Sequence, residues 1–95
     1  MEEKLYKNTE GLPVIIDMGE DVSTATNIVL HVTKPDSTTT TWTGAIVYNT
    51  NYFKYTLKSG DVDQVGPYKI HPHSTLGSWT GFWETTSIRV YDEYE

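Results

Sequence analysis

Residues 27–34 (Asn-Ile-Val-Leu-His-Val-Thr-Lys) alternate so regularly that they predict a β-strand. Because successive side chains of a strand point to opposite faces, one face of this strand would be aliphatic. The side chains on that face are Ile28, Leu30 and Val32. The next residues, 34–37 (Lys-Pro-Asp-Ser), are typical of a turn, since proline presets its backbone angle and aspartate can bond its own backbone. This combination predicts that the chain reverses into a second strand over 39–48.

Short strand-like runs and turn residues alternate along the rest of the chain, and no segment has apolar residues at helical spacing. The other predicted strands lie at 12–17, 52–57, 66–74 and 79–91. In the last of these the apolar alternation slips between Trp83 and Ile88, which predicts a β-bulge. Turns at intervals of about 8–12 residues are typical of sandwiches. The sequence therefore predicts an all-β fold, an immunoglobulin-like antiparallel β-sandwich of roughly six to seven strands over residues 12–91, with an N-terminal arm over 1–11 and an acidic C-terminal tail over 92–95.

Residues 66–68 (Gly-Pro-Tyr) begin one of these strands after an acidic connection. In immunoglobulin-like sandwiches a tyrosine at this place turns its hydroxyl back to the upstream backbone, in a motif called the tyrosine corner. Gly66 and Tyr68 are the candidates for this corner, and an ordinary core tyrosine at a strand start is the alternative. Antibody domains have a cysteine two residues after the tyrosine, but residue 70 is isoleucine and the chain has no cysteine. The fold must therefore rely on packing, to which three Trp, seven Tyr and two Phe contribute.

Length and charge narrow the possible partners. The 95 residues fit one domain and carry a formal net charge of −6. This charge argues against nucleic acid, whose phosphates need a basic surface, and against an anionic membrane surface. The absence of cysteine excludes disulfides and thiolate zinc sites and fits a reducing cytoplasm. No apolar run approaches the ~20 residues of a membrane span, and the start Met1-Glu2-Glu3-Lys4 does not resemble a signal peptide.

Candidate metal ligands are few and irregularly spaced. His71 and His73 would share one face of a strand and could bind zinc if His31 or a carboxylate joined them. Pro72 between them is explained more simply by an exposed edge strand. An oxygen-rich calcium site between loops is a second possibility, with the candidates Asp17, Glu20, Asp21, Asp61 and Asp63. Acidic loops are usually just solvated, so we expect no metal and no cofactor.

Catalytic motifs are absent from the sequence as well. There is no nucleophile elbow, phosphate-binding loop or zincin motif. Glu84 lies inside a predicted strand, but a general acid–base pair needs a second group that the sequence does not identify. We therefore predict that the protein is not an enzyme.

The aromatic side chains are the candidates for an interaction surface. Trp79 and Trp83 are four residues apart on one predicted strand, so their rings would share a face. Tryptophan is common in cores, at subunit interfaces and on platforms that stack against sugars, and all three roles remain open for these two residues and Trp42. An interface is predicted first at the last strand and second beside the hairpin tip at 49–51. Its candidates are Trp79, Phe82, Trp83, Tyr91, Tyr48 and Tyr52.

Residues 15–26 (Ile-Ile-Asp-Met-Gly-Glu-Asp-Val-Ser-Thr-Ala-Thr) begin a longer series of motifs. The series continues with the aliphatic strand 28–32, Lys-Pro-Asp at 34–36, Thr-Trp-Thr at 41–43, Ser-Gly-Asp-Val-Asp at 59–63 and Gly-Pro-Tyr-Lys-Ile at 66–70. It resembles small Ig-like virion proteins of tailed phages and prophages, and it is similar to the N-terminal sandwich domains of some phage baseplate proteins. The resemblance covers the chain from about Leu12 to Val90, and it departs from the pattern at Ser37, where glycine is common. The shared motifs are loop and turn residues, with no catalytic residue among them.

The resemblance implies a non-enzymatic structural subunit of a tailed-phage particle, acting as an assembly, adaptor or decoration module. Its partners would be other virion proteins and copies of itself. Its location would be the virion, at the tail, baseplate, neck or capsid surface, after synthesis in the cytoplasm of the host bacterium. The residues themselves leave open a carbohydrate-binding module, in which exposed Trp and Tyr rings bind a surface glycan. A cell-surface adhesion module is a third possibility, disfavoured by the missing signal segment.

Overall fold

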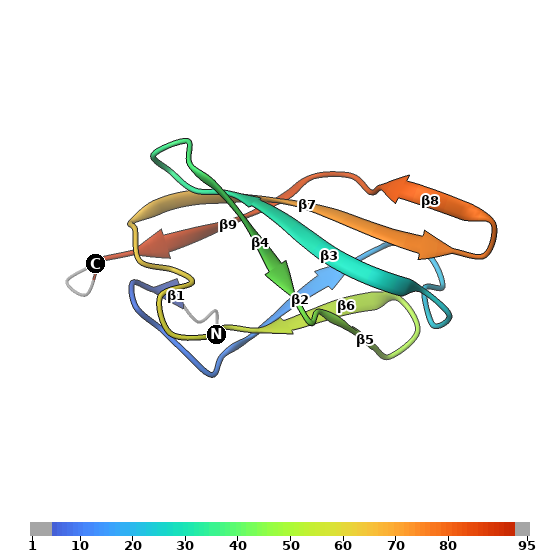
Figure 1. Cartoon of the computed structure of the whole chain (residues 1–95). Coiled ribbons are helices and arrows are strands. Elements are labelled where there is room, and N and C mark those ends of the chain that lie inside the picture. The colour runs from blue at the N-terminus through green and yellow to red at the C-terminus, as the bar shows by residue number, and fades with distance from the viewer. Residues whose placement is uncertain (1–4, 93–95) are drawn as a thin grey trace.

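The computed structural model describes residues 5–92, which form two β-sheets packed face to face (Figure 1). The strands are β1 (Leu5–Tyr6), β2 (Pro13–Asp17), β3 (Thr26–Thr33), β4 (Thr39–Thr43), β5 (Ile46–Tyr48), β6 (Tyr52–Thr56), β7 (Gly66–Leu76), β8 (Trp79–Phe82) and β9 (Thr86–Tyr91). The larger sheet has the order β1-β9-β7-β3-β4, with β8 also paired to β7, and the smaller sheet has the order β2-β6-β5. The described residues include no helix. The prediction of an all-β sandwich is therefore confirmed, whereas the immunoglobulin-like assignment stays a prediction.

The described residues form more strands than the six to seven predicted, and not all of them are antiparallel. Gly44, at a φ of 81°, ends β4 in the larger sheet so that β5 can begin in the smaller one, because glycine adopts positive φ without a steric penalty. The predicted strand over 39–48 is thus divided between the sheets. The predicted N-terminal arm contributes β1, which pairs in parallel with β9. Residues 1–4 of that arm and 93–95 of the predicted tail lie outside the described part.

A β-bulge divides the predicted last strand into β8 and β9, which both pair with the same edge of β7. His73 is opposite Phe82 and Ile70 is opposite Thr86, so two residues of β7 face the three residues 83–85. The Trp83 backbone N–H still donates to the Pro72 carbonyl at 2.8 Å. One extra residue shifts which side chains point inward. The slipped alternation in the sequence has this physical origin, as predicted.

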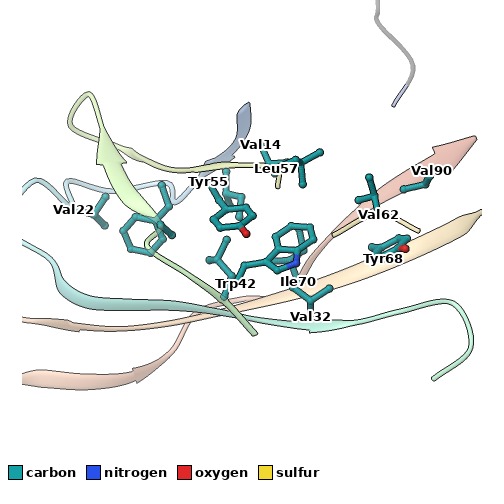
Figure 2. Packing of buried hydrophobic residues seen from close by; sticks show 14 residues of the cluster. Val14, Val22, Val32, Trp42, Tyr55, Leu57, Val62, Tyr68, Ile70 and Val90 are labelled. Atoms are coloured by element: carbon teal, nitrogen blue, oxygen red, sulfur yellow. The ribbon is translucent and has the colours of Figure 1, made fainter. Parts of the chain in front are cut away.

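The core lies between the two sheets and is built from alternate residues of their strands (Figure 2). On β3, Leu30 and Val32 are fully buried, as the alternation predicts. Trp42 of β4 stacks on Tyr55 of β6 with ring centroids 4.9 Å apart and an angle of 10° between the ring planes. Trp42 is therefore a core residue that joins the two sheets. Full burial of one large apolar side chain stabilises a fold by about 1.5–3 kcal/mol, so such pairs carry much of the stability of a chain without disulfides.

The connection between β6 and β7, residues 57–65, is held by tyrosines from both sheets. The Tyr68 hydroxyl accepts a hydrogen bond from the Gln64 backbone N–H at 2.9 Å. This contact to the upstream backbone is the arrangement that defines a tyrosine corner. The Tyr55 hydroxyl donates to Asp61 Oδ2 at 2.7 Å. The connection therefore has a hydrogen bond to each sheet.

Charge reinforces the same connection. Lys34 Nζ lies 2.9 Å from Asp63 Oδ1, and this hydrogen-bonded pair lowers the pKa of Asp63 and raises the pKa of Lys34. Burial raises the pKa of Tyr55 and of Tyr68, and at Tyr55 the hydrogen bond to Asp61 adds to the effect. These shifts favour an ionised Asp63 and Lys34 and a neutral Tyr55 and Tyr68, which are the states that these side chains ordinarily have at neutral pH.

Candidate functional site

The β7–β8 hairpin reaches beyond the smaller sheet at one end of the sandwich, beside the β2–β3 loop (Figure 1). Trp79 and Trp83 lie on the side of the hairpin that faces this loop, with ring centroids 5.1 Å apart and an angle of 75° between the ring planes. Trp79 and Trp83, which were predicted to share one face of a strand, are therefore in contact. Their rings form a corner and not a flat row.

Each of these indoles is held in place by a neighbour. The Trp83 Nε1–H donates to Ser74 Oγ at 2.7 Å, and Ser74 is fully buried. The Trp79 ring lies against Gly81, where an added Cβ would stand 3.0 Å from Cζ2 of the ring. Glycine within a strand often marks such a close approach. The corner is therefore set by the fold before any ligand is bound.

The corner opens into a pocket of about 440 Å³, which is within the usual range for small-ligand sites. Its lining residues are Glu20, Leu76, Trp79, Phe82, Trp83 and Glu84. A second pocket of about 390 Å³ has three of its walls in common with the first, and it adds Asp17 as a third carboxylate. The shared walls are Glu20, Trp83 and Glu84. Among the described residues, no lysine, arginine or histidine lines either pocket.

The three histidines gather around Phe82 on the outer face of the larger sheet. Their ring centroids lie 5.2 Å (His31), 4.4 Å (His71) and 4.7 Å (His73) from that of Phe82. The phenyl ring, 51% exposed, thus contacts all three of the imidazoles considered for zinc. Within residues 5–92 no group of three or more His, Asp or Glu side chains is arranged to hold a metal ion.

The five acidic residues considered for calcium do not come together. The carboxylates of Asp17 and Asp21 accept backbone N–H groups two residues ahead, within the β2–β3 loop. Asp61 and Asp63 lie in the β6–β7 connection, bound to Tyr55 and Lys34. Glu20 lines the first pocket, and it lines the second pocket together with Asp17.

The other predicted interface residues lie apart from the tryptophan corner. Tyr48 and Tyr52 contact each other at the β5–β6 hairpin, with ring centroids 6.5 Å apart, and neither lines the two pockets described above. Tyr91 lies on β9, with the Arg89 guanidinium carbon 5.6 Å from its ring centroid. The structure therefore brings Trp79 and Trp83 together, with Phe82 on the same hairpin but its ring on the opposite face of β8. The three tyrosines lie apart from all of them.

Sequence reasoning missed the supporting residues of the site. Ser74 and Leu76 gave no signal, because their roles depend on which strand packs beside them. Gly81 carried a usable signal, since an isolated glycine within a strand suggests close approach of another group.

No family model, no curated protein and no solved structure matches this chain. Between residues 5 and 92 there is also no helix long and apolar enough to cross a membrane.

Proposed function

We propose that the protein is a non-enzymatic assembly module of a tailed-phage particle, which docks on its partner through the surface formed by Trp79, Phe82 and Trp83. The observation that carries the proposal is the exposure of large aromatic rings on one short strand. Trp79 is 44% exposed and Phe82 is 51% exposed. The two rings point to opposite faces of β8, so both faces of this edge strand present an exposed aromatic side chain. Exposed large apolar side chains are a usual mark of a protein–protein contact, because leaving them in water is unfavourable.

The order of the strands supports an immunoglobulin-like assignment for this module. Such sandwiches pair the second, fifth and fourth strands in one sheet, and the third strand with the last two in the other. Here β2-β6-β5 corresponds to the first set, and β3-β7-β9 corresponds to the second. The Tyr68 hydroxyl contact at the start of β7 fits the same scheme.

The phage assignment rests on the resemblance alone, and the aspartates of its motifs form turns in the structure. Asp17 and Asp21 each accept the backbone N–H two residues ahead, and Asp36 does the same for Thr38. These side chains set loop conformations. This is the role expected in a structural subunit.

A single substitution separates an assembly role from a core role for the tryptophan corner. We expect Trp79→Ala to abolish association with particles that lack the protein, or with other copies, while the unfolding free energy changes by less than about 1 kcal/mol. Ile46→Ala is the matched control, since Ile46 is 58% exposed on the other sheet. Sedimentation, particle binding and urea unfolding provide the measurements.

Two results would overturn the assembly proposal. One is a wild-type chain that stays monomeric at high concentration and also fails to bind particles that lack it. The other is a Trp79→Ala variant that associates normally but loses about 3–5 kcal/mol of stability, as a core substitution would.

A carbohydrate-binding module is the second candidate, favoured by the same pocket. Trp79 and Trp83 line it together with two carboxylates, which can accept hydrogen bonds from sugar hydroxyls. A glycan screen tests this function directly. It requires a hit that Trp79→Ala removes, and a screen without any hit would end it.

A further inference from the structure

The pocket lined by Trp79, Phe82 and Trp83 (the aromatic pocket) has two carboxylates in its lining, from Glu20 and Glu84, and Asp17 lines the adjoining pocket. Among the described residues, no basic side chain lines either pocket. Within residues 5–92, the side chains of Glu20 and Glu84 form neither an ion pair nor a hydrogen bond. Carboxylates that share a concave surface focus a negative potential into it. The pocket is therefore suited to a positively charged group.

The two indoles add a second preference for a cation. A cation is attracted to the face of a tryptophan ring, within about 6 Å of its centroid. Trp83 is fixed by Ser74 and Trp79 lies against Gly81, so both rings are positioned in advance. The 75° angle between them makes a corner. A compact cation on an alkyl stem fits a corner better than a broad sugar ring, which stacks best on a flat surface.

From this geometry we infer that the pocket receives a lysine or arginine side chain from a basic segment of a partner protein. The alkyl stem of that side chain packs against Leu76, and its charged end lies between the carboxylates. The adjoining pocket, with Asp17, extends the acidic surface along the same segment. The inference rests on the proposed assembly function and states the chemistry of the partner.

A second copy of this chain is a poor source of the cation. The chain has 13 acidic and 7 basic residues, so two copies repel each other. Several of its cations are already engaged: Lys34 pairs with Asp63, and Lys54 and Arg89 lie over tyrosine rings of their own chain. A basic partner is instead attracted by the net charge of −6.

A blocked pentapeptide with two arginines, compared with its citrulline counterpart, tests the inference on the full chain. The two peptides have nearly the same shape but differ in charge. We expect the arginine peptide to shift the indole N–H signals of Trp79 and Trp83 in NMR spectra and to leave Trp42, which is buried, unchanged. Added salt should weaken the binding, because the attraction is between charges.

Substitution of the two carboxylates gives the decisive comparison. We expect Glu20→Gln combined with Glu84→Gln to weaken arginine-peptide binding by about tenfold or more, with the Trp42 signal as a check on folding. Glu10→Gln is the matched control, since Glu10 is exposed and lines neither pocket. Equal binding of the citrulline peptide, or undiminished binding by the double variant, would overturn the inference. So would shifts produced by neutral oligosaccharides when the arginine peptide produces none.

The same variants separate this inference from the assembly role. If Trp79→Ala abolishes assembly but the double glutamate variant assembles normally, the basic partner is wrong and the assembly function stands. If both variants assemble normally, both proposals fail.

Discussion

The hydroxyl groups of Tyr55 and Tyr68 show how single polar atoms close this sandwich. They come from different sheets and reach the same connection, where one donates to Asp61 and the other accepts from Gln64. A buried polar group without a partner costs more than its hydrogen bond contributes. Because both hydroxyls have a hydrogen-bond partner, Tyr55 and Tyr68 fix the conformation of the β6–β7 connection without leaving a buried polar group unpaired.

The first expected result concerns Tyr68→Phe. Removing the hydroxyl leaves the Gln64 N–H without its acceptor, so we expect a loss of about 1–3 kcal/mol in the free energy of unfolding in urea. Tyr48→Phe is the control, because Tyr48 is 47% exposed, and it should change stability by less than about 0.5 kcal/mol. Equal stabilities for the two variants would show that the corner hydrogen bond contributes nothing.

Trp42 carries the second expected result. Its ring is buried against Tyr55, but its Nε1–H has no hydrogen-bond partner among the described residues. Trp42→Phe leaves a cavity but also removes the unpaired donor, so we expect the free energy of unfolding to fall by only about 1–2 kcal/mol. Trp42→Ala removes the whole ring and should lose about 3–5 kcal/mol. Trp83→Phe provides the contrast, because it breaks a bond to buried Ser74. A Trp42→Phe variant as unstable as Trp42→Ala would contradict this account.

Residue roles were predictable where a local motif sets them. Tyr68 follows a Gly-Pro pair at a strand start, and that pattern pointed to its hydroxyl contact. Trp42 was left open between core and surface, because nothing in its neighbours says which sheet covers it. Ser74 was invisible, since its partner Trp83 is nine residues away along the chain and adjacent only after β7 and β8 pair.

At the scale of elements, β7 organises the larger sheet. It pairs with β3 along one edge and with both β8 and β9 along the other. The alternation of apolar residues predicted the positions of β3 and β7, and its slip predicted the bulge. The exposed edge strand expected at Pro72 is wrong, because β7 is paired on both edges and Pro72 is buried. It failed over 39–48, where uninterrupted alternation would place Trp42 and Ile46 on one face. Gly44 instead moves the chain between sheets, so Trp42 is buried and Ile46 is exposed.

Gly66 at the start of β7 gives an expected result at this scale. Its φ of 129° disfavours other residues, and an added Cβ would lie 3.1 Å from two atoms of Pro35. We expect Gly66→Ala to lose about 2–3 kcal/mol of stability, since strain and crowding add. Gly60→Ala is matched, because Gly60 also has a positive φ but open space around it, and it should lose less. Similar losses in urea unfolding would show that Pro35 yields without cost.

At the scale of the whole molecule, the two ends of the sandwich contain different groups of side chains. One end contains the tyrosine contacts and the Lys34–Asp63 pair, and the other contains the tryptophan corner with its carboxylates. The all-β class followed from strand-like runs alone. The sheet order and the parallel β1–β9 pair did not, because pairing between distant segments leaves little trace in either segment.

The distribution of charge sets the expected pH dependence of stability. Hydrogen bonds from Ser23, from Thr38 and from Lys34 lower the pKa values of Asp21, Asp36 and Asp63 respectively. Lowered folded values contribute stability that is present above the unfolded pKa and lost as the pH falls below about 4. The raised pKa values of Lys34, Tyr55 and Tyr68 act in the opposite direction. Their contribution is lost as the pH rises above about 10.

We therefore expect the free energy of unfolding, measured in urea from pH 2 to 11, to fall at both ends (roughly below 4 and above 10). Asp63→Asn should make the acid decline shallower, because the variant no longer has the carboxylate that must be protonated. Lys34→Met should do the same by removing the partner, and the two changes should not add. At neutral pH each should cost less than about 1 kcal/mol, since the pair is partly exposed to solvent. An acid decline that is unchanged in both variants would place the pH sensitivity in Asp21 and Asp36. It would leave the contact between Lys34 and the β6–β7 connection without a measurable role.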